Sequence, residues 1–187
     1  MAAAAIVNTP PPVLVVMGVS GAGKSTIATA VAERLCWTFL EGDDLHPAAN
    51  IAKMKSGIPL DDADRAPWLA AIAAWIDRQA QACDPAVVAC SALKRRYRQI
   101  LTDGRPFVRI VYIDGDRDII RERIAARTHL YFPPALLDSQ FEALEPPGSD
   151  EHPIVVDISQ PLEAQVEAIV AAISFPSPLV RGSLAVK

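Results

Sequence analysis

The chain has 187 residues with 18 basic and 22 acidic side chains, a formal net charge of −4. Its length is typical of one domain, and the acidic excess disfavours nonspecific nucleic-acid binding, which needs a dominant positive field. The three cysteines, Cys36, Cys83 and Cys90, form no CxxC pair and favour a reducing compartment, for which we expect the cytoplasm. Because no apolar run approaches the roughly 20 residues that cross a bilayer, we expect a soluble protein without a membrane partner.

Both ends of the chain differ in composition from the part between them. Residues 1–12 lack the basic start of a signal peptide and lead into three consecutive prolines, and residues 174–187 contain turn formers without an apolar period. We therefore expect two disordered tails around a single domain, residues 13–173.

Between these ends, short β-branched runs alternate with longer segments of helical spacing. This alternation predicts βαβ units, a parallel sheet and the α/β class. Asp64 and Asp116 suit helix N-caps, and Pro161 suits a first helical turn. The expected strands are 13–17, 38–40, 86–90, 107–113 and 154–158, and the expected helices are 24–35, 47–55, 64–82, 91–102, 116–126 and 161–173.

Two segments interrupt the alternation. Residues 43–65 hold a short helix and an acidic turn, and residues 128–134 form an aromatic, proline-rich link. Insertions at the edge of an α/β sheet are typical places for substrate contacts and mobile lids. We expect a substrate segment at 43–65 and a lid at 123–142.

The strongest motif is the unbroken GxxxxGK[ST] match at residues 18–25, placed after a strand and before a helix. Its glycines let backbone N–H groups surround phosphate oxygens at a helix N-terminus. Lys24 is expected to neutralise the β- and γ-phosphates, and the Ser25 hydroxyl to join the Mg²⁺ shell. The predicted nucleotide contacts here are Gly18, Val19, Ser20, Gly21, Ala22, Gly23, Lys24, Ser25 and Thr26.

The motif leaves open whether the phosphoryl group passes to water or to an acceptor. No NKxD tetrapeptide is present, which weakens a GTP-switch interpretation, and the small size favours a small-molecule kinase. Asp43 follows the second expected strand, where carboxyl ends open into the ligand crevice, so it is the candidate general base. A helix N-cap before Pro47 is the alternative for Asp43 or Asp44, and His46 by itself indicates a buried hydrogen-bonding histidine.

Several segments between the phosphate loop and the lid form a recognisable set: 18–25, 42–47, 50–54, 57–62, 64–65, 67–69, 90–94, 97–98 and 137–142. Through these segments the sequence resembles the gluconokinases, over about residues 13–173. The resemblance implies ATP-dependent phosphorylation of the 6-hydroxyl of D-gluconate, giving 6-phosphogluconate and ADP. It also implies a shikimate-kinase-like fold with a five-stranded sheet of order 2-3-1-4-5, a homodimer, and an adenine bordered by Gln160 and Pro161.

Beside this resemblance, helical spacing brings several polar groups together. Asn50 and Lys53 share a face just after His46, so the three can converge on a polyhydroxy acid, whereas Lys55 suits a solvated face. In the next basic stretch, Ser91, Lys94 and Arg98 share a face, and Lys94 or Arg98 suits the gluconate carboxylate or phosphates; a solvated face is the alternative. The full substrate-binding prediction is Asp43, His46, Asn50, Lys53, Ser91, Lys94, Arg98, His129 and Gln140.

Arginines crowd the helix that leads into the lid. Arg123 and Arg127 share a face at i, i+4, and we expect them to reach ATP phosphates on closure, Arg127 as the catalytic cation. Surface ion pairs are the expectation for Arg117 and Arg121. The rival hypotheses are a kinase for shikimate or another polyol acid, and a non-catalytic regulatory module gated by ATP.

Overall fold

A computed structural model describes residues 10–125 and 134–174 of the chain. The expected tails lie mostly outside these residues, as do two predicted site residues, Arg127 and His129. The observations below concern the described ranges.

The sheet has five parallel strands in the order β2-β3-β1-β4-β5. This confirms the predicted class and strand order. Their bounds agree with the predicted strands to within one residue at each end: β1 Val13–Met17, β2 Thr38–Glu41, β3 Ala86–Ala89, β4 Val108–Asp114 and β5 Ile154–Asp157.

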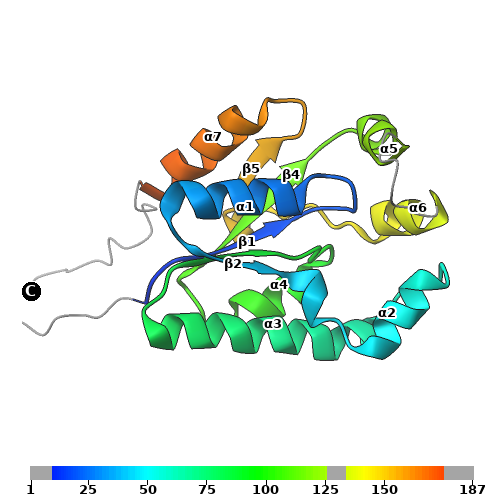
Figure 1. Ribbon diagram of the computed structural model, residues 1–187, viewed down its shortest axis with the longest axis horizontal. Coiled ribbons are helices and arrows are strands. Elements are labelled where there is room, and N and C mark those ends of the chain that lie inside the picture. The colour runs from blue at the N-terminus through cyan, green and yellow to red at the C-terminus, as the bar shows by residue number, and fades with distance from the viewer. Residues whose placement is uncertain (1–9, 126–133, 175–187) are drawn as a thin grey trace, which may run out of the picture.

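Helices cover both faces of the sheet (Figure 1). α1 and α7 pack together on one face, and α3 and α4 on the other. The remaining helices, α2, α5 and α6, gather at the end toward which the strands point, and there they surround the carboxyl ends. The bounds are α1 Lys24–Leu35, η1 Gly42–Leu45, α2 Ala48–Lys55, α3 Asp62–Ala82, α4 Arg95–Thr102, α5 Arg117–Ala125, α6 Pro134–Ala143, η2 Ser149–Glu151 and α7 Leu162–Ser174, η denoting a 3₁₀ turn.

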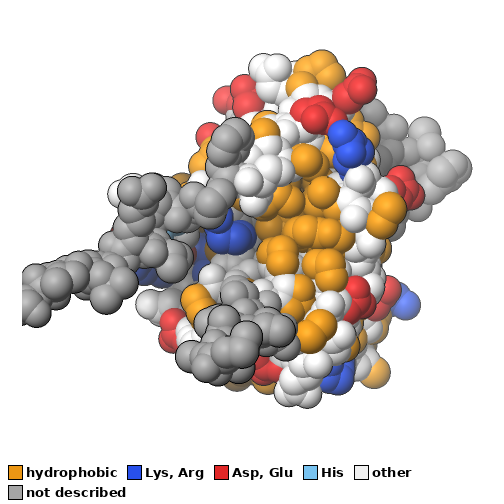
Figure 2. All heavy atoms as spheres, turned by 90° about the vertical axis from the view of Figure 1, so that its left-hand side faces the viewer, with side chains coloured by type: hydrophobic (Ala, Val, Ile, Leu, Met, Phe, Trp, Pro, Cys, Tyr) orange, Lys and Arg blue, Asp and Glu red, His pale blue; other side chains and the backbone are white. Residues whose placement is uncertain are grey.

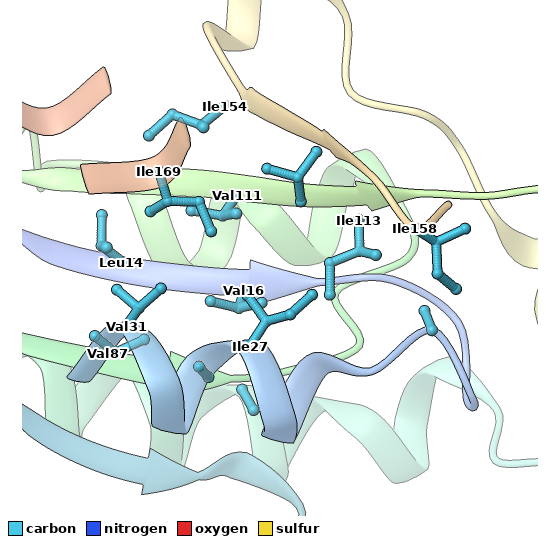
Figure 3. Close-up of a cluster of buried hydrophobic side chains, with 14 of the residues drawn as sticks. Leu14, Val16, Ile27, Val31, Val87, Val111, Ile113, Ile154, Ile158 and Ile169 are labelled. Atoms are coloured by element: carbon cyan, nitrogen blue, oxygen red, sulfur yellow. The ribbon is translucent and has the colours of Figure 1, made fainter. Parts of the chain in front are cut away.

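Two hydrophobic clusters, one on each face, explain why β1 is apolar throughout. Leu14 and Val16 point into the cluster under α1 and α7 (Figure 3), while Val13, Val15 and Met17 point into the cluster under α3. Because side chains alternate along a strand, a strand covered on both faces must be apolar at every position. No described helix is long and apolar enough to span a bilayer.

Two predicted helix starts are wrong. α3 begins at Asp62, with Asp61 as its N-cap: the Asp61 carboxylate accepts from the Asp64 N–H at 2.8 Å, and the Asp64 carboxylate accepts from the Asp61 N–H at 3.0 Å. Asp64 is thus the third helical residue of a capping box. The helix expected at 91–102 begins at Arg95, because Ala92 has a left-handed φ of 39° that no α-helix accommodates. Ser91, Lys94 and Arg98 therefore do not share one helical face.

Candidate active site

The phosphate loop joins β1 to α1 and has the backbone that its glycines predicted. Gly21 and Gly23 have φ values of 84° and 96°, which side chains with a Cβ rarely adopt, and Gly23 is the N-cap of α1. The Lys24 ammonium donates to the Val19 carbonyl at 3.2 Å and so lies over the loop. The exposed Ser25 follows in the first turn of α1. Loop amides and the lysine thus surround a position suited to phosphate.

A cleft of about 310 Å³ opens beside this loop at the carboxyl ends of the strands. Six predicted residues line it: Ser20, Lys24, Asp43, His46, Ser91 and Gln140. The structure thus brings together side chains from the phosphate loop, the end of β2, the end of β3 and α6. The cleft places a phosphate-binding lysine and a carboxylate in one cavity, the arrangement that phosphoryl transfer to a hydroxyl requires.

Asp43 is held in this cleft by its neighbour Gly42. A Cβ on Gly42 would lie 2.3 Å from the Ala89 carbonyl oxygen, so only glycine permits this approach of η1 to β3. The Trp68 indole donates to the Gly42 carbonyl at 2.7 Å and fixes the same turn from α3. The Asp43 side chain itself remains 65% exposed toward the cleft. Its backbone is therefore rigidly placed while its carboxylate stays accessible.

Beneath Asp43, the buried His46 ring stacks on Trp68, with ring centroids 4.3 Å apart and an interplanar angle of 13°. Burial lowers the pKa of His46; the Asp43 carboxylate acts in the opposite direction and Arg65 adds to the lowering. Asn50 lies behind the ring and is 4% exposed. Since Asn50 does not line the cleft, the structure places it in a supporting position and not among the expected substrate contacts.

Three predicted cationic contacts are placed differently by the structure. Lys53 pairs with Asp64 at 2.5 Å, and Lys94 pairs with Asp62 at 3.0 Å; neither lines the cleft beside the phosphate loop. Arg98 is only 1% exposed and pairs with Glu151, and its guanidinium also donates to the Leu93 and Glu145 carbonyls. The prediction that Arg98 faces the crevice is therefore wrong. Its ion pair with Glu151 instead joins α4 to the segment before β5.

The cleft instead contains two cations that sequence reasoning left out, Arg65 and Lys55. Arg65 lies one residue after the capping box of α3, and its Nε donates to the Leu60 carbonyl at 3.3 Å. In the described part of the chain, Arg65 makes no ion pair. Its sequence signals were its place directly after the acidic turn and its membership of a segment that carries the family resemblance, and Lys55 was expected on a solvated face. Apolar groups complete this wall: Ile51, Met54, Ile58, Pro59 and Leu60.

Gln140 from α6 reaches across the cleft to the phosphate loop. Its side-chain oxygen accepts from the Ser20 N–H at 2.7 Å, and its amide nitrogen donates to the Ser20 hydroxyl at 2.9 Å. Gln140, which we predicted to contact the substrate, is therefore hydrogen-bonded to the phosphate loop in this structure. α6 is anchored nearby, because Leu137 is buried in the core.

The predicted nucleotide-base side of the site lies between α5 and the turn after β5. Arg123 donates to the Ile158 carbonyl at 2.7 Å, so in this structure it bonds to that turn and does not line the cleft. Gln160 and Pro161 follow in the same turn and are exposed. Arg123, which we expected at the ATP phosphates, thus contacts the turn after β5 that we expected beside the adenine.

The described residues offer no cluster of three His, Cys, Asp or Glu side chains suited to a metal ion. A metal at this site would accordingly take its ligands mainly from phosphate and water oxygens, as Mg²⁺ commonly does.

Comparison with known proteins agrees with this geometry. An AAA-domain family matches residues 13–147. The thermoresistant gluconokinase of Escherichia coli (strain K12) is 45% identical over 86% of this chain and 93% of that protein, and a gluconokinase of Gluconobacter oxydans (strain 621H) is 50% identical over 75% and 79%. A crystal structure of a gluconokinase from Sinorhizobium meliloti 1021 superposes with a TM-score of 0.79 at 44% identity, covering 88% of this chain and 92% of that one.

The matches to these relatives cover from 75% to 88% of the chain. The identity is far above the level at which only a fold is shared. The chain therefore belongs to the gluconokinase family, within the AAA-domain family of nucleotide-binding proteins.

Proposed function

We propose that the chain is an ATP-dependent gluconokinase that phosphorylates the 6-hydroxyl of D-gluconate, giving 6-phosphogluconate and ADP. The observation that carries the proposal is that Lys24 and Asp43 line one cleft, so that a γ-phosphate and an acceptor hydroxyl have adjacent places. The family relationship supports gluconate as the acceptor. A module that only bound ATP would need no carboxylate beside the phosphate loop.

In the proposed reaction, the loop amides and Lys24 hold the β- and γ-phosphates, and Asp43 accepts the proton of the attacking hydroxyl. A bond forms from that oxygen to the γ-phosphorus while the bond to the β-bridging oxygen breaks, and ADP leaves. Because Lys24 and Asp43 line the same cleft, direct transfer to the hydroxyl needs no phosphorylated intermediate. Most of the rate gain comes from positioning and from charge neutralisation.

For gluconate itself, Arg65 is the proposed partner of the carboxylate. It lines the cleft, and the Nε donation to Leu60 fixes the guanidinium. A guanidinium matches a carboxylate through two parallel hydrogen bonds. Lys55 adds positive charge to the same wall, and Ser91 supplies a hydroxyl near the end of β3. These contacts replace Lys53, Lys94 and Arg98 in the predicted substrate set.

Mg²⁺ fits the oxygen groups beside the loop. The Ser25 hydroxyl is exposed at the first turn of α1 and would be one ligand, while the remaining ligands would be phosphate and water oxygens. When bound, the ion neutralises charge that develops on the phosphate oxygens. The lid roles of Arg127 and Arg123, the contact of His129, the adenine contacts of Gln160 and Pro161, the homodimer and the cytoplasmic location stay predictions.

The proposal is tested by measuring ADP release with a panel of acceptors. Gluconate, shikimate, gluconolactone and nucleoside monophosphates are each supplied with ATP and Mg²⁺, and the product is identified by mass spectrometry. We expect turnover with gluconate and a 6-phosphorylated product. Turnover with shikimate but not with gluconate would reassign the substrate, and ATP binding without turnover on any acceptor would favour the regulatory module.

A further inference from the structure

His46 lies under the proposed base with both ring nitrogens facing polar groups. Its Nδ1 is 3.4 Å from the Asn50 amide nitrogen, and its Nε2 is 3.9 Å from an Asp43 carboxylate oxygen. The His46 side chain is 3% exposed and lies flat against Trp68. The ring therefore has a fixed plane, and its two edges point in defined directions.

The identity of the Asn50 atom follows from its other contact. The Asn50 amide nitrogen also donates to the Asp64 carbonyl at 2.7 Å, and a carbonyl oxygen can only accept. The atom at that position is thus the NH₂ group, whose second hydrogen faces His46 Nδ1. Nδ1 must then be an acceptor, and in a neutral imidazole the other nitrogen, Nε2, carries the hydrogen.

We propose that Asn50 fixes His46 as the neutral Nε2–H tautomer and that this N–H orients the Asp43 carboxylate toward the attacking hydroxyl, whose proton it accepts. The inference rests on the proposed function, because it assigns His46 to the base of that reaction. His46 is a positioning residue: it orients the acceptor of the proton and does not take the proton itself. In the proposed arrangement the separation of 3.9 Å shortens to a hydrogen bond when substrate fills the cleft, as catalytic hydrogen bonds commonly do.

The charges around the pair favour this arrangement. Lys24 from α1, Lys55 from α2 and Arg65 from α3 all line the cleft that Asp43 and His46 share. Burial disfavours a positive charge on the ring, as do Arg65 and the Asn50 hydrogen, whereas the Asp43 carboxylate acts in the opposite direction. A neutral donor is the form of histidine that can serve Asp43 without competing for its proton.

Two matched variants distinguish the role of the His46 N–H from that of its stacking on Trp68. His46→Phe keeps an aromatic ring for Trp68 and removes the N–H, whereas His46→Gln loses the ring and keeps an N–H near the position of Nε2. We expect His46→Phe to lower kcat by about 10-fold with little change in KM for gluconate, because the carboxylate loses its orientation. We expect His46→Gln to restore most of kcat.

The pH profile supplies a readout that a purely structural role would not move. Loss of a donor to a carboxylate favours its protonated form, so the acid limb of kcat should shift to higher pH in His46→Phe and stay in place in His46→Gln. Unfolding temperatures and ATP affinities of both variants verify that they fold. A rise in KM alone would make His46 a substrate ligand, and an equal loss of kcat in both variants would assign the effect to the stack; either result overturns the proposal.

The tautomer is measured without any activity. In ¹⁵N-labelled protein, the shifts of the two ring nitrogens distinguish the Nε2–H, Nδ1–H and doubly protonated forms, and His46→Phe identifies the His46 signals among the three histidines. We expect the Nε2–H form at neutral pH. An Nδ1–H or charged ring would overturn the inference even in an enzyme that phosphorylates gluconate, whereas failure of the wild-type protein to use gluconate would overturn the proposed function.

Discussion

Asp43 and its neighbour Asp44 are both exposed carboxylates, but only Asp43 lines the cleft. Asp43→Asn removes the proton acceptor while keeping the size of the side chain. We expect kcat to fall by about 10²- to 10⁴-fold, with ATP affinity little changed, because the phosphate loop is untouched. Steady-state kinetics and calorimetric ATP titration measure the two effects.

Asp44→Asn is the matched control and should keep its turnover. Nearly full activity in Asp43→Asn would remove Asp43 from the role of base. The alternative raised by the sequence, a helix cap before Pro47, finds no support in the structure, because neither η1 nor α2 has a side-chain cap hydrogen bond.

Arg65 is the second test at the scale of single residues. Arg65→Ala should raise KM for gluconate by about 10- to 100-fold, the usual consequence of losing a charged hydrogen bond, with a smaller effect on KM for ATP. Arg78→Ala provides the control, because Arg78 is an exposed arginine on the same helix and does not line the cleft. An unchanged KM for gluconate in Arg65→Ala would show that another group holds the carboxylate.

Among the helices, Asp62 connects the start of α3 to α4. Its carboxylate accepts hydrogen bonds from the Tyr97 hydroxyl, from Lys94 at 3.0 Å and from Arg96. The Tyr97 hydrogen bond, followed by that of Lys94, lowers the pKa of Asp62 from 3.8 to about 2. Lys94, which the sequence assigned to the substrate, is therefore paired with Asp62 instead.

Because the folded pKa of Asp62 lies below its unfolded value, the ionised carboxylate stabilises the fold above pH 3.8, and this contribution is lost as the pH falls through about 2. Asp62→Asn should therefore unfold at a lower temperature than the wild type at pH 7, with the difference shrinking between pH 4 and pH 2. Thermal unfolding followed by circular dichroism measures it. A difference that stays constant down to pH 2 would contradict an electrostatic role.

At the scale of the whole molecule, the charge distribution separates the two ends of the sheet. Figure 2, which shows the end opposite the helices α2, α5 and α6, has hydrophobic side chains in its middle and charged side chains mainly toward its margin. The cleft with Lys24, Lys55 and Arg65 lies at the carboxyl ends of the strands. A net charge of −4 is thus compatible with a local site for small anions.

In the part of the chain that the structure describes, the hydrophobic clusters draw their members from residues 13–173. A shortened chain of residues 10–174 should accordingly keep the unfolding temperature of the full chain to within a few degrees and keep its kcat, since it retains every described residue of the core and of the cleft. Calorimetry and the ADP-release assay compare the two chains. A loss of cooperative unfolding or of turnover would extend the domain beyond the predicted boundaries.

The sequence by itself determined the strands of the sheet and the phosphate loop, whereas the strand order was implied by the resemblance to gluconokinases. Strands buried on both faces are apolar at every position, as in Val13–Met17, and the loop conformation depends on glycines that are adjacent in the chain. Such features are encoded over a few residues, so periodicity and motif spacing reveal them. The position of Asp43 could also be predicted, because Asp43 follows a strand and the carboxyl ends of parallel strands lie at the same edge of the sheet.

Tertiary structure alone decided which cations face the cleft. Lys53, Lys94 and Arg98 are neutralised by Asp64, Asp62 and Glu151, which lie 11, 32 and 53 residues away along the chain. Helical spacing places residues on a face but does not say which opposite charge meets them there. Pairing between distant segments placed these three groups outside the cleft, whereas Arg65 lines it and has no ion pair among the described residues.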